Sequence, residues 1–314
     1  FSFLLFGFAA SLPILFISRF LQGVFAGAVL PAARAYAADI TAKQERVKVM
    51  GRIGASLSLG VIFGPAIGGI FAGVNLSFPF FAAAIVALVN FFFVLFFLPE
   101  SLTQKTNGIL RVKKLLFSNF SALWHGMQSS ITPLLVLAFL WSFTFSNNQV
   151  AVPLLGLERF RLTPADIGIL FAILGGVSAI VQFFFLEKIA KKIGQHKTIF
   201  FGMAVMAIGF AMMPFSPSTI FLYAATGIAG LGSAVTRPII TALISEETTM
   251  EQGATMGMAN AYESLGRFIG PLAGGFLFGV LSFLPFVLAG TVVGIVLLSL
   301  LFFKKGFFAV RHRI

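Results

Sequence analysis

Five charged side chains lie inside long apolar stretches of this chain: Arg19, Arg34, Arg237, Glu263 and Arg267. Glu263 and Arg267 are four positions apart, so on a helix they lie one turn apart and can form an ion pair. A charge inside an apolar helix is costly and by default indicates ion, proton or substrate binding. The alternatives are that Arg19 extends toward the edge of the apolar layer, and that the ion pair only fixes helix packing.

Three consecutive amides, Asn147, Asn148 and Gln149, interrupt another apolar stretch. They cannot bind and release a proton, but they donate and accept hydrogen bonds. We expect them to line a cavity and contact a substrate; a bridge between helices is the alternative. The three histidines lack metal-ligand spacing, and no phosphate-binding Gly-x-x-x-x-Gly-Lys-Ser/Thr loop is present. We therefore expect no enzyme, no metal and no cofactor.

A glycine–proline motif occurs twice, 206 positions apart. Its copies are Gly60, Gly64, Pro65, Gly68 and Gly69, and Gly266, Gly270, Pro271, Gly274 and Gly275. Between Met50–Gly69 and Met256–Gly275, ten of twenty aligned positions are identical. Glycine at every fourth position makes a smooth helix face, and the proline bends the helix by removing a backbone donor. We expect bent helices at the seam between two duplicated halves; ordinary small-residue packing is the alternative.

The composition of the chain indicates a membrane protein. Hydrophobic residues make up 58% and charged residues 10% of it, whereas soluble domains carry about 25% charged residues. Apolar stretches long enough to cross a hydrocarbon core as helices recur along the chain. They are Pro13–Ala37, Ile53–Gly73, Phe78–Leu98, Pro133–Leu154, Ile167–Leu186, Ile199–Pro214, Ile220–Ile244, Gly257–Phe278 and Leu284–Phe303, with Phe1–Ala10 as the end of one more. The sequence predicts an all-α polytopic helix bundle with about ten spans.

The net charge of +12 indicates membrane orientation and not nucleic-acid binding. Sixteen of the 22 basic residues lie in alternate connections and in the carboxyl-terminal tail. Cytoplasmic loops carry an excess of lysine and arginine, so we expect these segments and the carboxyl terminus in the cytoplasm. In the connection 100–131, apolar and basic residues fall on separate helical faces, which predicts an interfacial helix on the inner leaflet. A solvated linker is the alternative.

The repeat also predicts the organisation of the chain. The second copy lies in the sixth span after the span that holds the first, so both cross the membrane in the same direction, as parallel repeats do. We expect an incomplete amino-terminal half at 1–99, the linker at 100–131, a six-helix half at 132–304 and a basic tail at 305–314. By the repeat offset, the chain is expected to be a fragment whose first half lacks two helices and part of a third. The halves should superpose by a rotation of about 180° around the membrane normal, with Gly64 over Gly270.

Five segments resemble motifs of the major facilitator superfamily. They are Arg19–Gly23 (Arg-x-x-x-Gly), Gly60–Gly69 (the antiporter motif), Leu98–Ser101, Thr236–Pro238 and Gly266–Gly275, the last two as in Gram-positive multidrug and fluoroquinolone exporters. The resemblance covers essentially the whole chain. It implies a monomeric twelve-helix drug:proton antiporter of the bacterial plasma membrane that exports amphipathic small molecules by alternating access. A sugar or amino-acid efflux permease and a non-transporting receptor or scaffold are the alternatives.

The resemblance also implies how a proton would be carried. Arg19 would face the central cavity and take part in a relay with an acid on the first helix of the family. As we align them, related exporters carry carboxylates where this chain has Gln149 and Ala234. Neither residue can titrate, so Glu263, or an acid elsewhere, would have to bind and release the proton.

Glu187 lies in a connection similar to a basic loop of the family. By the two-fold relation it is expected near Arg46, Lys48 or Arg52, at the start of a helix where the dipole favours negative charge. Such a contact would latch the halves on the cytoplasmic side and break when the cavity opens inward. A solvated loop that only sets the topology is the alternative.

The two glycine motifs are expected to differ in burial. In the family a helix from the other half covers the second motif, and that helix is expected to be absent here. We therefore expect an exposed glycine face at residues 266–275 and a face at residues 60–69 covered by the span at Ile167–Leu186.

Overall fold

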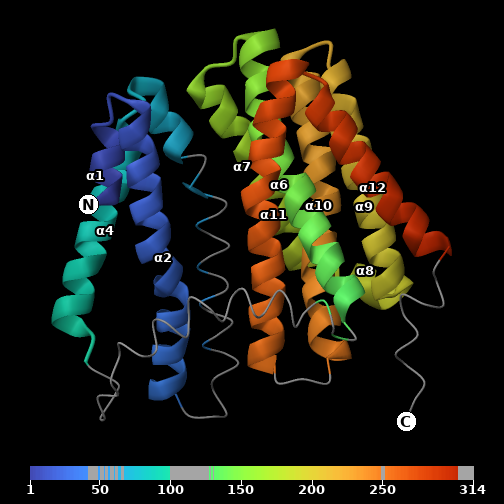
Figure 1. Cartoon of the computed structure of the whole chain (residues 1–314), viewed down its shortest axis with the longest axis horizontal. Helices are drawn as coiled ribbons and strands as arrows, with labels where there is room; N and C mark the ends of the chain where they lie inside the picture. The colour runs from blue at the N-terminus through green and yellow to red at the C-terminus, as the bar shows by residue number, and fades with distance from the viewer. Residues whose placement is uncertain are drawn as a thin grey trace. The chain divides into compact units, whose positions relative to one another are not determined.

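The computed structural model describes residues 1–41, 67–99, 131–248 and 252–302, and the single residues 49, 53, 56, 60, 63, 64, 127 and 129. Every regular element within these residues is a helix (Figure 1). Five helical stretches in this part are long and apolar enough to cross a membrane: Phe78–Phe97, Thr132–Phe160, Pro164–Ile193, Gln195–Phe215 and Thr219–Glu247. The all-α membrane fold predicted from the sequence is confirmed. The chain divides into two compact units, residues 1–106 with 163–172, and residues 107–162 with 173–314.

The first unit contains α1 (Ser2–Gly7), α2 (Leu12–Ile40), α4 (Phe78–Phe97) and the beginning of α7. Prolines occupy the first turns of α2 and α4, where no backbone donor is needed. α1 packs against both α2 and α4, and the ring centres of Phe6 and Phe80 lie 4.2 Å apart. The rest of α4 presents large exposed side chains that suit contact with lipid: Phe91, Phe92, Phe93, Phe96 and Phe97.

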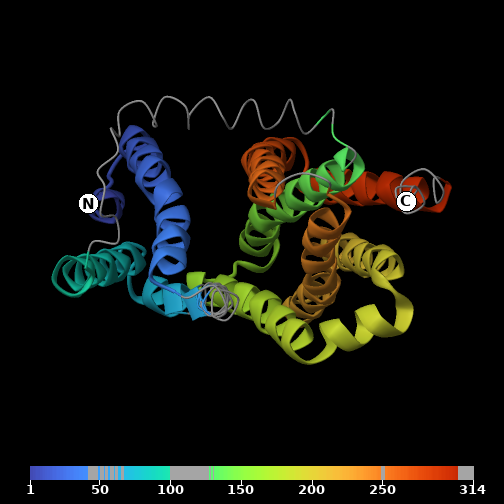
Figure 2. The ribbon, with the colours of Figure 1, turned by 90° about the horizontal axis from the view of Figure 1, so that it is seen from below.

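The second unit is a bundle of long helices (Figure 2). It contains α6 (Thr132–Phe160), the rest of α7 (Pro164–Ile180), α8 (Leu186–Ile193), α9 (Gln195–Met212), α10 (Thr219–Glu247), α11 (Gln252–Val280) and α12 (Leu284–Phe302). A π turn at Val181–Phe185 joins α7 to α8, and a 3-10 turn at Met213–Phe215 follows α9. α11 packs along α6 and α9 along α10, while α12 contacts both α6 and α9. Leu135, Met203, Leu222 and Ala289 are completely enclosed in this core.

Glycines let α9 and α10 approach closely. A Cβ atom added to Gly209 would lie 2.5 Å from the backbone nitrogen of Ala229, and one added to Gly202 would lie 2.5 Å from the Thr236 hydroxyl. Without side chains at these positions the two backbones come into direct contact, as small residues allow in membrane bundles. This close pair fixes the position of α10, which carries part of the candidate site.

The observed helices confirm the predicted spans that lie within the described residues, with two differences. The span expected over Ile167–Leu186 begins at Pro164 and contains the π turn, which no periodicity in the sequence indicates. The basic connection after this span is mostly helical and forms α8. Ile189 and Ile193 fall on one face of this helix and the lysines on others, a pattern typical of an amphipathic helix.

The helix expected in the connection 100–131 lies outside the described residues. The expected domain boundaries remain predictions; the compact units place residues 163–172 with the first unit.

Candidate functional site

An arginine–glutamate–arginine cluster lies between α10 and α11. Oε2 of Glu263 accepts a hydrogen bond from Arg237 on α10 and another from Arg267 on α11, each over 3.0 Å. Arg267 lies one turn after Glu263, as the spacing in the sequence predicts. Arg237 lies 26 positions before Glu263 and reaches it through helix packing. The expected pair within α11 is therefore present, and a second cation joins it.

Helix α6 supplies a further wall of the cluster. The Trp141 ring centre lies 5.6 Å from the guanidinium carbon of Arg237, which allows a cation–π attraction. The hydroxyl of Ser142 donates to the backbone carbonyl of Glu263 over 2.7 Å. Three helices thus meet at one charged centre.

The charges of the cluster are buried to different degrees. The side chain of Glu263 is 7% exposed, whereas those of Arg237 and Arg267 are 53% and 46% exposed. A buried carboxylate is strongly disfavoured unless it is paired, so the two arginines compensate its charge. The cluster carries one net positive charge, and both guanidinium groups remain partly open. This arrangement can exchange ion-pair partners and can bind a polar or anionic group.

The three amides of α6 do not act together. Asn147 and Asn148 are buried, whereas Gln149 is exposed. Asn147 donates to the backbone carbonyl of Pro285 over 2.9 Å and so bridges α6 and α12. Asn148 donates to the carbonyl of Thr144 in its own helix. Bridging is therefore observed for Asn147, and cavity lining by these amides remains a prediction.

Sequence reasoning singled out Asn148 but missed Trp141 and Thr144, which lie on the same face of α6. Trp141, Thr144 and Asn148 are three and four positions apart, so their side chains share one face of the helix. Each has a buried side-chain nitrogen or oxygen without a hydrogen-bond partner in the described part of the chain. Their helical spacing is the signal that could have revealed them.

The second glycine motif packs against α6, so the prediction of an exposed face was wrong. Its stripe is buried at Gly266, Gly270 and Gly274. A Cβ atom added to Gly266 would lie 2.6 Å from the carbonyl oxygen of Phe139, and one added to Gly270 would lie 2.5 Å from that of Phe143. The stripe therefore serves packing inside the second unit. The motif has a second face, since a Cβ at Gly275 would meet no described atom within 4 Å.

The first glycine motif is described in part. No described atom lies within 4 Å of a Cβ added at Gly60, Gly64 or Gly68, and Pro65 lies outside the described residues. Gly69 contacts α7, because its added Cβ would lie 2.6 Å from the Cα atom of Gly168. The expected cover by the span at Ile167–Leu186 is thus observed at Gly69 and not along the stripe that precedes it.

Arg19 lies against aromatic rings of the first unit. Its guanidinium carbon is 4.3 Å from the ring centre of Phe6 and 6.0 Å from that of Phe80, and it donates to Gln22 over 2.8 Å. Arg19 forms no ion pair within the described part of the chain. Its role in a proton relay remains a prediction. Gly23, which is exposed, was expected in the hinge and seam motif, and that role also remains a prediction.

Glu187 pairs within α8. Its carboxylate lies 2.5 Å from the ammonium group of Lys191, and both side chains are exposed. The partners expected from the sequence, Arg46, Lys48 and Arg52, lie outside the described residues. A latch between the halves remains a prediction. An exposed ion pair contributes little to stability, so Glu187 can exchange this partner for another at small cost.

Known proteins are similar to this chain along most of its length. The sequence model of the Major Facilitator Superfamily matches residues 1–185 and 134–310. Multidrug resistance protein 2 of Bacillus subtilis (strain 168) is 33% identical over 296 residues, which cover 92% of this chain and 72% of that protein. Quinolone resistance protein NorA of Staphylococcus aureus is 28% identical over 269 residues, which cover 85% of this chain and 67% of that protein.

Two solved structures show the same fold. The D-xylose–proton symporter superposes with a TM-score of 0.69 at 18% identity, covering 93% of this chain and 71% of that one. The human organic anion transporter MFSD10 superposes with a TM-score of 0.65 at 22% identity, covering 96% of this chain and 73% of that one.

Proposed function

The chain belongs to the major facilitator superfamily of membrane transporters, and we propose that it exports amphipathic, drug-like small molecules in exchange for protons. The observation that carries this proposal is the cluster between α10 and α11, in which the buried Glu263 pairs with the partly exposed Arg237 and Arg267. Charges inside a membrane bundle are costly, and those that occur there mark ion and substrate pathways by default.

The substrate class is inferred from the relatives and from the walls of the cluster. The relatives are named for resistance to multiple drugs and to quinolones. Beside the charges, α6 offers the indole of Trp141, and the two guanidinium groups of the cluster are partly open. An amphipathic molecule needs both an aromatic or apolar surface and a few polar partners, and this combination is typical of small-molecule sites.

We assign the binding and release of the coupling proton to Glu263. It is the buried carboxylate among the described residues. Protonation of Glu263 would remove the charge that attracts both arginines, so the link that Arg237 makes between α10 and α11 would weaken. A proton would thereby shift the balance between conformations that open to opposite sides, as alternating access requires. We further infer a multi-pass protein of the cell membrane, acting as a monomer, with its carboxyl terminus in the cytoplasm.

Efflux from living cells tests this function. Bacteria that lack their own drug exporters and express the full-length protein should expel preloaded ethidium, an amphipathic fluorescent cation, faster than vector-carrying cells. A protonophore should stop the efflux, whereas ATP depletion with an intact proton gradient should not. Efflux no faster than in vector-carrying cells would contradict the drug substrate. Efflux that continues without a gradient would contradict the coupling.

A further inference from the structure

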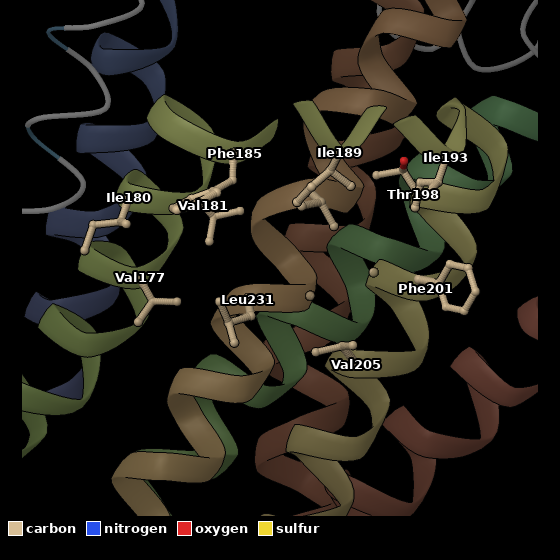
Figure 3. Close-up of a pocket in the computed structure, with 13 residues that line it drawn as sticks. Val177, Ile180, Val181, Phe185, Ile189, Ile193, Thr198, Phe201, Val205 and Leu231 are labelled. Atoms are coloured by element: carbon tan, nitrogen blue, oxygen red, sulfur yellow. The ribbon is translucent and has the colours of Figure 1, made fainter. Parts of the chain in front are cut away.

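A cavity of about 520 Å³ lies in the second unit, among α7, α8, α9 and α10 (Figure 3). Its volume falls within the range of small-molecule sites. Val177 of α7, Val205 of α9 and Leu231 of α10 point into it. None of its lining residues belongs to the charged cluster, so it is a separate site.

The lining of this cavity is apolar. Thr198 is the polar side chain among the lining residues, and its hydroxyl already donates to the backbone carbonyl of Gly194 over 2.8 Å. Burying a polar group without a hydrogen-bond partner is unfavourable. The enclosed part of an occupant must therefore be hydrocarbon.

Helix α8 adds a basic rim to the cavity. Ile189 and Ile193 line it, and Lys188 and Lys192 directly precede them, about 100° around the helix. Both lysines are exposed, and neither has an ion-pair partner in the described part of the chain, in contrast to Lys191. Two uncompensated cations beside a hydrocarbon cavity are complementary to a molecule with an anionic head and an acyl tail.

We propose that this cavity binds one acyl chain of an anionic phospholipid whose phosphate contacts Lys188 and Lys192. The excess of basic residues in this connection orients α8 toward the inner leaflet, where anionic headgroups attract basic segments. An acyl chain gains little by moving from bulk lipid into an apolar cavity. Selectivity must therefore come from the lysines, and a zwitterionic lipid with the same chains binds more weakly. The site is independent of the exported substrate and of proton coupling.

The test uses the purified full-length protein and phosphatidylglycerol with a photoreactive diazirine on one acyl chain. Cross-links should map to residues 177–205 and to residues 231–235 of α10, which line the cavity, and labelling should saturate at lower concentrations than with the matching phosphatidylcholine. Lys188→Gln with Lys192→Gln should weaken phosphatidylglycerol binding about 25-fold, roughly fivefold for each lysine, and leave phosphatidylcholine binding unchanged. Glu187→Gln with Lys191→Gln is the matched control, because it alters the same helix without changing its net charge.

A second pair of variants tests the cavity itself. Val205→Phe fills it and should suppress the cross-links of both lipids, whereas Ile208→Phe, at an exposed position on the same helix, should not. Unfolding temperatures of both variants establish that they are folded. Cross-links confined to residues outside 177–205 and 231–235, equal binding of the two lipids, or unchanged labelling of the Val205→Phe variant would overturn the proposal.

Discussion

Glu263 is ionisable, buried and paired with two cations, a combination that recurs at no other described residue. The spacing in the sequence predicted its pair with Arg267, because both lie on one helix. The partner on α10 could not be predicted, because it depends on how α10 and α11 pack. Arg19 was also recognisable in the sequence, as a charge inside an apolar stretch. Its contacts with Phe6 and Phe80 could not be predicted, because they depend on how separate helices pack.

Gly270 should tolerate no side chain. In Gly270→Ala, the new Cβ would lie 2.5 Å from a backbone oxygen of Phe143, which cannot move aside as a side chain can. We expect a loss of about 2 kcal/mol of stability from overpacking, measured as a lower unfolding temperature in detergent. Gly275→Ala is the matched control, since a Cβ there meets no described atom within 4 Å and should change stability little. Equal unfolding temperatures for the two variants would contradict the packing of α11 on α6.

At the scale of elements, the apolar stretches predicted the described helices well, because length and hydropathy alone decide which segments cross a membrane. Two features were beyond such reasoning. The π turn at Val181–Phe185 has no periodic signal, and α8 combines basic residues with only a short apolar face. The partner of the second glycine stripe was assigned wrongly, because a glycine every fourth position defines a smooth face but not the helix that packs against it.

Helix α8 provides the test of the proposed latch. Glu187→Gln should slow drug efflux without lowering the amount of protein in the membrane, because orientation follows lysine and arginine. Lys191→Gln is the control, since it removes the partner seen in the structure but leaves the acid free to reach another cation. Transport should be measured per inserted molecule. If Glu187→Gln transports normally, the latch is wrong and these charges set the topology alone.

At the scale of the whole molecule, the duplicated motif predicts two parallel halves, and the distribution of basic residues predicts which side faces the cytoplasm. The family and the all-α fold followed from motifs and composition. The superposition of the halves, with Gly64 over Gly270, remains a prediction.

The absence of cysteine from the chain makes its orientation measurable. Pro217→Cys, at an exposed position before α10, should react with a membrane-impermeant maleimide in intact cells. Lys188→Cys should react only after the cells are permeabilised. The reverse pattern would place the basic connections outside the cell and contradict the topology.

Proton coupling through Glu263 is tested most directly in proteoliposomes that contain the purified full-length protein and a pH-sensitive dye. An imposed proton gradient should drive drug transport by the unmodified protein and by Glu158→Gln, which changes an exposed acid near the end of α6. Glu263→Gln keeps a hydrogen-bonding side chain but cannot titrate. We predict that it still binds drug and that its gradient-driven transport falls to the rate of protein-free vesicles. Transport by Glu263→Gln at the unmodified rate, with the same proton flux, would contradict the assignment.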